Sequence, residues 1–261
     1  MCRMLGAASS SPGEVRLLVS CLARAAQRDV LRHDEVHGDG WGMAAYSREG
    51  LLVRRSARPI FDELSNANSL QLPAGEQLVM VHARAASDSS KVGIAYSHPY
   101  EALSADGRRL YLLAHNGSVD REGLGRALGL GELSGNYVDS ELALMVIARE
   151  GLSEGALELL RNYTETALDL LIMEVDRPSG AARLYAYSYW RDPGEGEYYE
   201  LRVISAGSTT AVVSSTVAKY CEALGLRHSG LGPGRLVMVG ELSVNSSGGL
   251  TGFSRWRGPT P

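Results

Sequence analysis

The order of apolar segments along the chain restricts the fold more than any other feature. Short apolar segments typical of strands come in groups, and segments with helical recurrence of apolar residues lie between the groups. The expected strands are 43–46, 51–54, 77–82, 110–114, 167–175, 182–187, 200–205, 210–214 and 236–239. The expected helices are 12–28, 120–128, 139–149, 153–162 and 215–224. Because strands and helices do not alternate regularly, we predict an α+β fold with mainly antiparallel sheets, not a Rossmann-type sheet.

Length and composition favour one domain over residues 2–261, with the last ten or so residues as a loose tail. The segment 190–199, rich in Gly, Glu, Asp and Tyr, is expected to be an exposed hairpin loop. A charged fraction of 21% and a net charge of −4 give no basis for a nucleic-acid partner. No segment approaches the roughly 18 to 20 apolar residues that cross a bilayer, and the amino terminus lacks the pattern of a secretory signal. We therefore expect no membrane partner and a cytoplasmic location.

Cysteine and histidine spacing argues against a metal site. Cys2, Cys21 and Cys221 are far apart and form no Cys-x-x-Cys pair, so neither a disulfide framework nor a zinc site is expected. Of the 6 histidines only one pair, at 33 and 37, is four residues apart, and no helix is expected there to present both as metal ligands. Segment 38–42 is rich in glycine but lacks both the βαβ setting and the lysine of a phosphate-binding loop, which disfavours a nucleotide. We expect no metal and no cofactor, and a loop packed beside Cys2.

Cys2 follows Met1 directly, and small second residues are those after which the initiator methionine is normally removed. Removal of Met1 would leave a thiol and a free α-amine on one residue. Since the amine titrates near ~8 and the thiol near ~8.5, the amine can accept the proton that the sulfur must lose. A cysteine at this position is usually an accident of the sequence, so only its companions favour catalysis.

Those companions are three polar motifs, expected at strand or helix ends. They are His-Ala-Arg-Ala-Ala-Ser at 82–87, His-Asn-Gly-Ser at 115–118 and Val-Asp-Ser-Glu at 138–141. Asn116 and Gly117 can supply a side-chain amide and a backbone N–H to the oxyanion that forms when a thiolate attacks an amide. The alternative for Asn-Gly is an ordinary type I′ hairpin turn. We expect His82 and His115 to be structural rather than basic.

Two charged residues match the amino-acid end of a substrate. Arg84 can hold a carboxylate through two parallel hydrogen bonds, and Asp139 can pair with an ammonium group. Each also has an ordinary explanation, as a surface arginine and as a helix cap. Together with Cys2 they predict an enzyme that recognises glutamine or a γ-glutamyl group and cuts its side-chain amide.

The ordered motifs Met-Cys-Arg-x-Leu-Gly, Gly-Asp-Gly-Trp-Gly, His-x-Arg-x-Ala-Ser, His-Pro-Tyr, His-Asn-Gly and Asp-Ser-Glu resemble those of class II glutamine amidotransferases. The chain is most similar to small stand-alone members related to the γ-glutamyl hydrolases of ergothioneine synthesis and glutathione degradation. The resemblance spans roughly residues 2–215. It implies an N-terminal-nucleophile hydrolase sandwich, with four layers in the order αββα.

The resemblance also implies residue roles. Cys2 matches the nucleophile, Arg84 the carboxylate binder and Asp139 the amine binder. Asn116 and Gly117 match the oxyanion hole. Ser87 and His98 fall on substrate-pocket positions. Ala85, Ala86 and Asp88 replace residues that are bulky or histidine in sugar-forming members, which predicts a different pocket mouth.

We therefore expect an amidohydrolase that converts glutamine or a γ-glutamyl compound into glutamate plus ammonia or an amine. Two alternatives remain: a glutaminase subunit that feeds ammonia to a separate synthase, and a non-catalytic relative that binds a glutamate-like ligand. The sequence does not predict the leaving group, nor whether the chain pairs with a synthase or forms a homo-oligomer.

Overall fold

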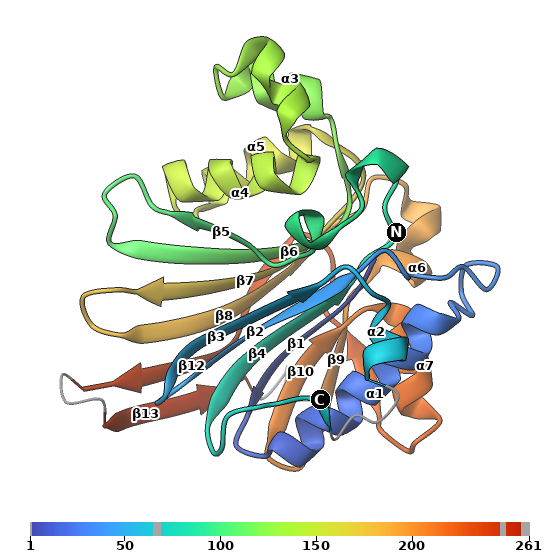
Figure 1. Cartoon of the computed structure of the whole chain (residues 1–261), viewed down its shortest axis with the longest axis vertical. Helices are drawn as coiled ribbons and strands as arrows, with labels where there is room; N and C mark the ends of the chain where they lie inside the picture. The colour runs from blue at the N-terminus through green and yellow to red at the C-terminus, as the bar shows by residue number, and fades with distance from the viewer. Residues whose placement is uncertain (1, 65–68, 246–248, 257–261) are drawn as a thin grey trace.

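Two antiparallel sheets lie face to face, and each carries helices on its outer side (Figure 1). The computed structural model of the chain describes residues 2–64, 69–245 and 249–256. The layer order is αββα, which confirms the expected fold class. None of the described helices is long and apolar enough to span a membrane.

The first sheet has the strand order β11-β9-β10-β1-β4-β2-β3. Its strands are β1 (Arg3–Ser9), β2 (Trp41–Ser47), β3 (Gly50–Ser56), β4 (Gln77–Ala83), β9 (Arg202–Ala206), β10 (Thr209–Val213) and β11 (His228–Gly230). Helices α1 (Pro12–Gln27), α2 (Ile60–Glu63) and α7 (Ser215–Glu222) cover its outer face. Helix α1 begins where the Ser11 side chain accepts a hydrogen bond from the Glu14 N–H and Pro12 occupies the first turn.

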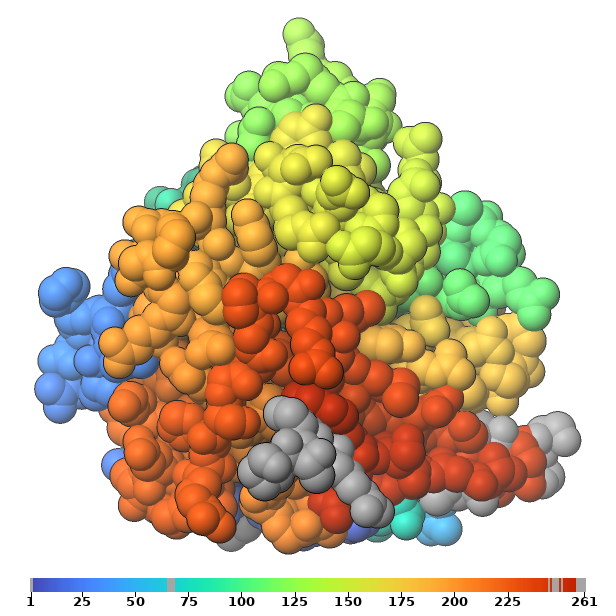
Figure 2. Space-filling view, turned by 180° about the vertical axis from the view of Figure 1, so that it is seen from behind, coloured from blue at the N-terminus to red at the C-terminus, as the bar shows by residue number. Residues whose placement is uncertain are grey.

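The second sheet has the strand order β13-β12-β8-β7-β6-β5. Its strands are β5 (Tyr100–Leu103), β6 (Arg109–Val119), β7 (Thr164–Asp176), β8 (Ala181–Ser188), β12 (Arg235–Val244) and β13 (Leu250–Arg255). Helices α4 (Asp139–Glu150) and α5 (Glu154–Asn162) pack on its outer face, and α3 (Arg121–Ala127) projects beyond them. Seen from behind, α5 lies above the orange and red surface formed by the last third of the chain (Figure 2).

Strand β1 shows how the sequence builds the layers. Its side chains alternate, so Leu5 and Ala7 pack in the core beneath α1 and α7, while Met4 and Ala8 pack between the sheets. Gly6 faces the second sheet as well, and a Cβ there would lie 2.8 Å from Leu171 Cδ2. The strand therefore needs a glycine at position 6, where the second sheet approaches most closely.

Several expectations need correction. Residues 190–199 are not an exposed hairpin loop, because the segment contains α6 (Gly196–Tyr199) and buries Tyr198 and Tyr199. His115 and Gly117 do not lie at a strand end or in a turn, since β6 continues through them to Val119. Strands β1, β5, β11 and β13 were not expected. Strand β13 pairs with β12 within the predicted tail, whose last residues, 257–261, lie outside the described residues.

A buried polar cluster holds the start of β1. The Arg3 side chain is fully buried, with Nε 2.8 Å from Asp29 Oδ2, and it also hydrogen-bonds the Tyr198 hydroxyl. His37 and Thr216 bond the same carboxylate at 3.0 and 2.6 Å. Burial raises the pKa of Asp29, but the His37 hydrogen bond and the Arg3 charge outweigh burial and hold it well below its ordinary value. The cluster thus joins β1 to α6, α7 and the segment after α1.

We expect Asp29→Asn to lower the free energy of unfolding at pH 7 by about 3–5 kcal/mol, because it leaves the Arg3 guanidinium buried without a counter-charge. The pKa of Asp29 is lower in the folded than in the unfolded chain. Asp29 therefore stabilises the fold fully at pH values above its ordinary pKa near ~3.9, and this stabilisation is lost as the pH falls below that value. Urea denaturation at pH 7 and pH 3 measures both effects. Asp34→Asn is the control, because its ion pair with Arg28 is exposed. Equal destabilisation by both variants would contradict the assignment.

Candidate active site

Cys2 stands one residue before β1, where the two sheets meet. Its backbone nitrogen donates a hydrogen bond of 2.8 Å to Asn116 Oδ1 on β6 of the other sheet. A second contact joins the sheets nearby, with His82 Nε2 3.1 Å from the carbonyl oxygen of His115. Since β1 pairs with β4 on one side and with β10 on the other, the first sheet fixes the position of Cys2, and the Asn116 hydrogen bond joins it to the second sheet.

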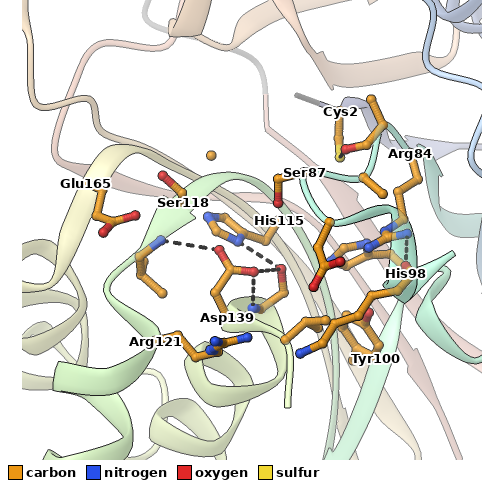
Figure 3. Close-up of a pocket in the computed structure, with 18 of the residues that line it drawn as sticks. Cys2, Arg84, Ser87, His98, Tyr100, His115, Ser118, Arg121, Asp139 and Glu165 are labelled. Atoms are coloured by element: carbon orange, nitrogen blue, oxygen red, sulfur yellow. Dashed lines mark hydrogen bonds between the residues drawn. The ribbon is translucent and has the colours of Figure 1, made fainter. Parts of the chain in front are cut away.

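A pocket of about 410 Å³ opens beside Cys2. The predicted site residues that line it are Cys2, Arg84, Ser87, His98, Gly117 and Asp139. Cys2 and Arg84 lie on one side of the pocket, Glu165 lies on the other, and Asp139 lies between them (Figure 3). Asn116 is not part of this lining; it is buried and accepts the hydrogen bond from the Cys2 nitrogen. The structure therefore brings together all seven residues, which come from distant parts of the sequence.

Gly117 has a conformation that no other residue would adopt easily. Its φ is +127°, and a Cβ at this position would lie 1.9 Å from the carbonyl oxygen of Ala167. The register between β6 and β7 shifts directly after it, between Gly117 and Val119. Such an irregularity turns the backbone out of the regular ladder, and Gly117, Ser118 and Val119 all line the pocket.

Arg84 is buried beside the pocket, and its hydrogen bonds go to backbone carbonyl groups. Its backbone N–H donates to Gly40 O at 2.9 Å, and its Nη1 donates to Lys91 O at 2.6 Å. Within the described part of the chain no carboxylate forms an ion pair with Arg84. A buried guanidinium without a carboxylate is costly unless a ligand supplies one, so this side chain is suited to bind an anionic group in the pocket.

Asp139 is the first residue of α4. Its Oδ1 accepts from the Ser140 N–H at 2.9 Å and its Oδ2 from the Val119 N–H at 3.3 Å. No ion pair involves Asp139 among the described residues. The carboxylate thus remains available to a cation in the pocket, at a helix N-terminus that stabilises its negative charge.

Burial keeps neutral the two histidines that line the pocket, His98 and His115, and His82 next to them. Burial lowers the pKa of His82 to about 3, and it also lowers the pKa of His98 and of His115. The His98 ring lies 4.1 Å from the His82 ring and 4.6 Å from that of Tyr100. Neutral rings in this stack can shape the pocket but cannot carry positive charge near neutral pH.

Sequence reasoning missed Asp169, which lies on β7 behind Asn116. Asn116 Nδ2 donates to its Oδ2 at 3.0 Å, and the Ser188 hydroxyl donates to its Oδ1 at 2.8 Å. A carboxylate within the apolar run Ala-Leu-Asp-Leu-Leu-Ile-Met is unusual, because aspartate is rarely fully buried without a partner. This aspartate within an apolar strand was the signal in the sequence that could have identified Asp169. No cluster of His, Cys, Asp and Glu among residues 2–64, 69–245 and 249–256 could hold a metal ion.

Comparison with known proteins agrees with this geometry. The family model of the class II glutamine amidotransferases matches residues 1–178. A search of curated proteins finds no significant match.

Two solved structures share the fold. One is titled as the allosteric regulatory enzyme of purine biosynthesis, with 17% identity and a TM-score of 0.61. The other is the glutamine phosphoribosylpyrophosphate amidotransferase from B. subtilis complexed with ADP and GMP, with 14% identity and a TM-score of 0.56. Each match covers 97% of this chain and 49% of the other, so the chain spans about half the length of either relative. The αββα sandwich is that of an N-terminal-nucleophile hydrolase, and the chain belongs to the class II glutamine amidotransferases.

Proposed function

We propose that the protein is an amidohydrolase in which Cys2, once Met1 is removed, cleaves the γ-amide of glutamine or of a γ-glutamyl compound. The observation that carries this proposal is the meeting of Cys2, the uncompensated Arg84 and the available Asp139 in one pocket. Arg84 would bind the α-carboxylate of the substrate and Asp139 its α-ammonium group. Ser87 and His98 would contact the substrate from the same lining.

The chemistry uses the two groups of Cys2. The α-amine takes the thiol proton, and the thiolate attacks the γ-carbonyl carbon to form a tetrahedral oxyanion. The Gly117 N–H and the second hydrogen of Asn116 Nδ2 would donate to this oxyanion, since the first bonds Asp169. The C–N bond then breaks, and the ammonia or amine leaves with the proton from the α-amine. Water hydrolyses the thioester and releases glutamate.

The extent of the pocket supports a substrate larger than glutamine. It continues past Asp139 to Ser118, Arg121 and Glu165, and neither Arg121 nor Glu165 forms an ion pair in the described part of the chain. This space supports our proposal that the natural substrate is a γ-glutamyl compound, as in the stand-alone γ-glutamyl hydrolases. We further propose that residues 2–261 form one such domain, which works in the cytoplasm. A separate synthase that receives ammonia is the alternative, and co-purification tests it.

Cys2→Ala should fold as the parent does but release no glutamate above background, because it has neither thiol nor thioester. Protein that retains Met1 should be equally inactive, because its Cys2 nitrogen is an amide. Glutamate release is measured with glutamine and a panel of γ-glutamyl amides, and intact mass reports the state of Met1. Activity of either form at the level of Met1-free protein would refute the mechanism.

Arg84→Lys should lower kcat/KM for glutamate release about 10- to 100-fold, mainly through KM, because lysine cannot form the paired hydrogen bonds to a carboxylate. Arg55→Lys is the matched control, since Arg55 bonds Pro99 O and Glu101 rather than lining the pocket. Steady-state kinetics on both variants gives the comparison. An unchanged KM in Arg84→Lys would remove Arg84 from substrate binding.

A further inference from the structure

Asp169 is the most unusual buried group outside the proposed catalytic set. Its side chain is fully buried, and it lies directly opposite Asn116 in the register between β7 and β6. Its neighbours on β7, Leu168 and Leu170, are also fully buried. A buried carboxyl group without a cationic partner normally lowers stability, so its position behind the Cys2 contact calls for a function.

The hydrogen bonds around Asp169 define the orientation of the Asn116 amide. Ser188 Oγ donates to Asp169 Oδ1 at 2.8 Å and accepts from the Leu201 N–H at 3.3 Å. Asp169 Oδ2 is then the acceptor for Asn116 Nδ2 at 3.0 Å. Both carboxyl oxygens of Asp169 thus accept a hydrogen bond, one from Ser188 and one from Asn116, so Asn116 directs its nitrogen toward Asp169 and its oxygen toward the Cys2 N–H.

We propose that Asp169 is a positioning residue that acts on Cys2 through Asn116. It holds the Asn116 amide so that Oδ1 receives the Cys2 nitrogen and the second Nδ2 hydrogen stays available for the oxyanion. If the amide turned round, Nδ2 would face the α-amine, and the protonated amine would lose its acceptor. This inference deepens the proposed function and rests on it.

The electrostatic setting agrees with a functional carboxyl group. Burial raises the pKa of Asp169 to about 8, and the Ser188 and Asn116 hydrogen bonds and the charge of Arg3 on β1 oppose this rise only in part. Tyr199 on α6 also interacts with Asp169. In the unfolded chain the group titrates near ~3.9, so between that pH and about 8 the folded state retains a proton that the unfolded state has lost. Asp169 therefore lowers stability as pH rises through this range, which is typical of a group retained for function.

The test compares Asp169→Asn with the parent as full-length, Met1-free protein. The first measurement is the rate of Cys2 alkylation by iodoacetamide against pH, followed by intact mass. Cys2 is half-buried, whereas Cys21 and Cys221 are fully buried, so native protein reacts at Cys2. Glutamate-release kinetics and thermal denaturation at pH 6 and pH 9 complete the comparison.

In Asp169→Asn we expect the midpoint of the alkylation curve to move to higher pH, because the ammonium group that stabilises the thiolate loses its acceptor. We expect kcat to fall about 10- to 100-fold with little change in KM, which is less than the loss of a whole oxyanion donor. The midpoint of thermal unfolding at pH 9 should equal or exceed that of the parent, since the variant buries no charge. The control Asp176→Asn changes the same residue type at the end of β7, where it contacts Ser179, and should leave the alkylation curve unchanged.

An unchanged alkylation midpoint in Asp169→Asn would overturn the inference, and so would a loss of kcat matched by a loss of thermal stability. If Asp169→Asn does not fold, Ser188→Ala replaces it, because it removes one hydrogen bond to the carboxylate and should move the midpoint in the same direction by less. No movement in Ser188→Ala would then overturn the inference. A shifted midpoint in a protein whose parent releases no glutamate from any amide would refute the proposed function but support the positioning role.

Discussion

The structure depends on the placement of β1 at the interior of the first sheet. Hydrogen bonds to β4 and β10 hold this strand on both sides, and the buried Arg3–Asp29 pair anchors its first residue. Cys2 directly precedes Arg3, so the contacts of Arg3 also fix the position of Cys2, although residues near a chain end are usually mobile. The contact with Asn116 then joins this position to the second sheet.

The site combines charges that the rest of the fold leaves uncompensated. Arg84 and Asp139 have hydrogen bonds to backbone groups but no ion pair among the described residues. Arg3, the residue after Cys2, instead forms a buried ion pair with Asp29. Paired buried charges fix the architecture, and unpaired ones are suited to a ligand that carries both signs. The α-carboxylate and α-ammonium groups of an amino acid form such a ligand.

The longer helices were predictable because apolar side chains recur along them with a clear period, whereas the four-residue helices α2 (Ile60–Glu63) and α6 were not expected. Helix α1, expected at 12–28, is found at Pro12–Gln27. Strand β1 was not expected, because Gly6, Ala7 and Ala8 carry small side chains that give little strand signal. Gly6 is required there by the close approach of Leu171 from the other sheet, a contact between positions far apart in sequence. For the same reason Asn116 and Gly117 looked like a turn but lie within β6, where Ala167 of β7 contacts Gly117.

The sequence by itself determined the α+β class and the identity of the polar residues, because both depend on local periodicity and on motifs with distinct chemistry. Only the tertiary structure decided which of these residues meet, since Cys2, Arg84, Asn116 and Asp139 approach one another through strand pairing and sheet stacking. It also decided the role of Asp169, whose importance comes from burial behind Asn116. Burial and opposition across strands depend on distant segments, and no local pattern in the chain encodes them.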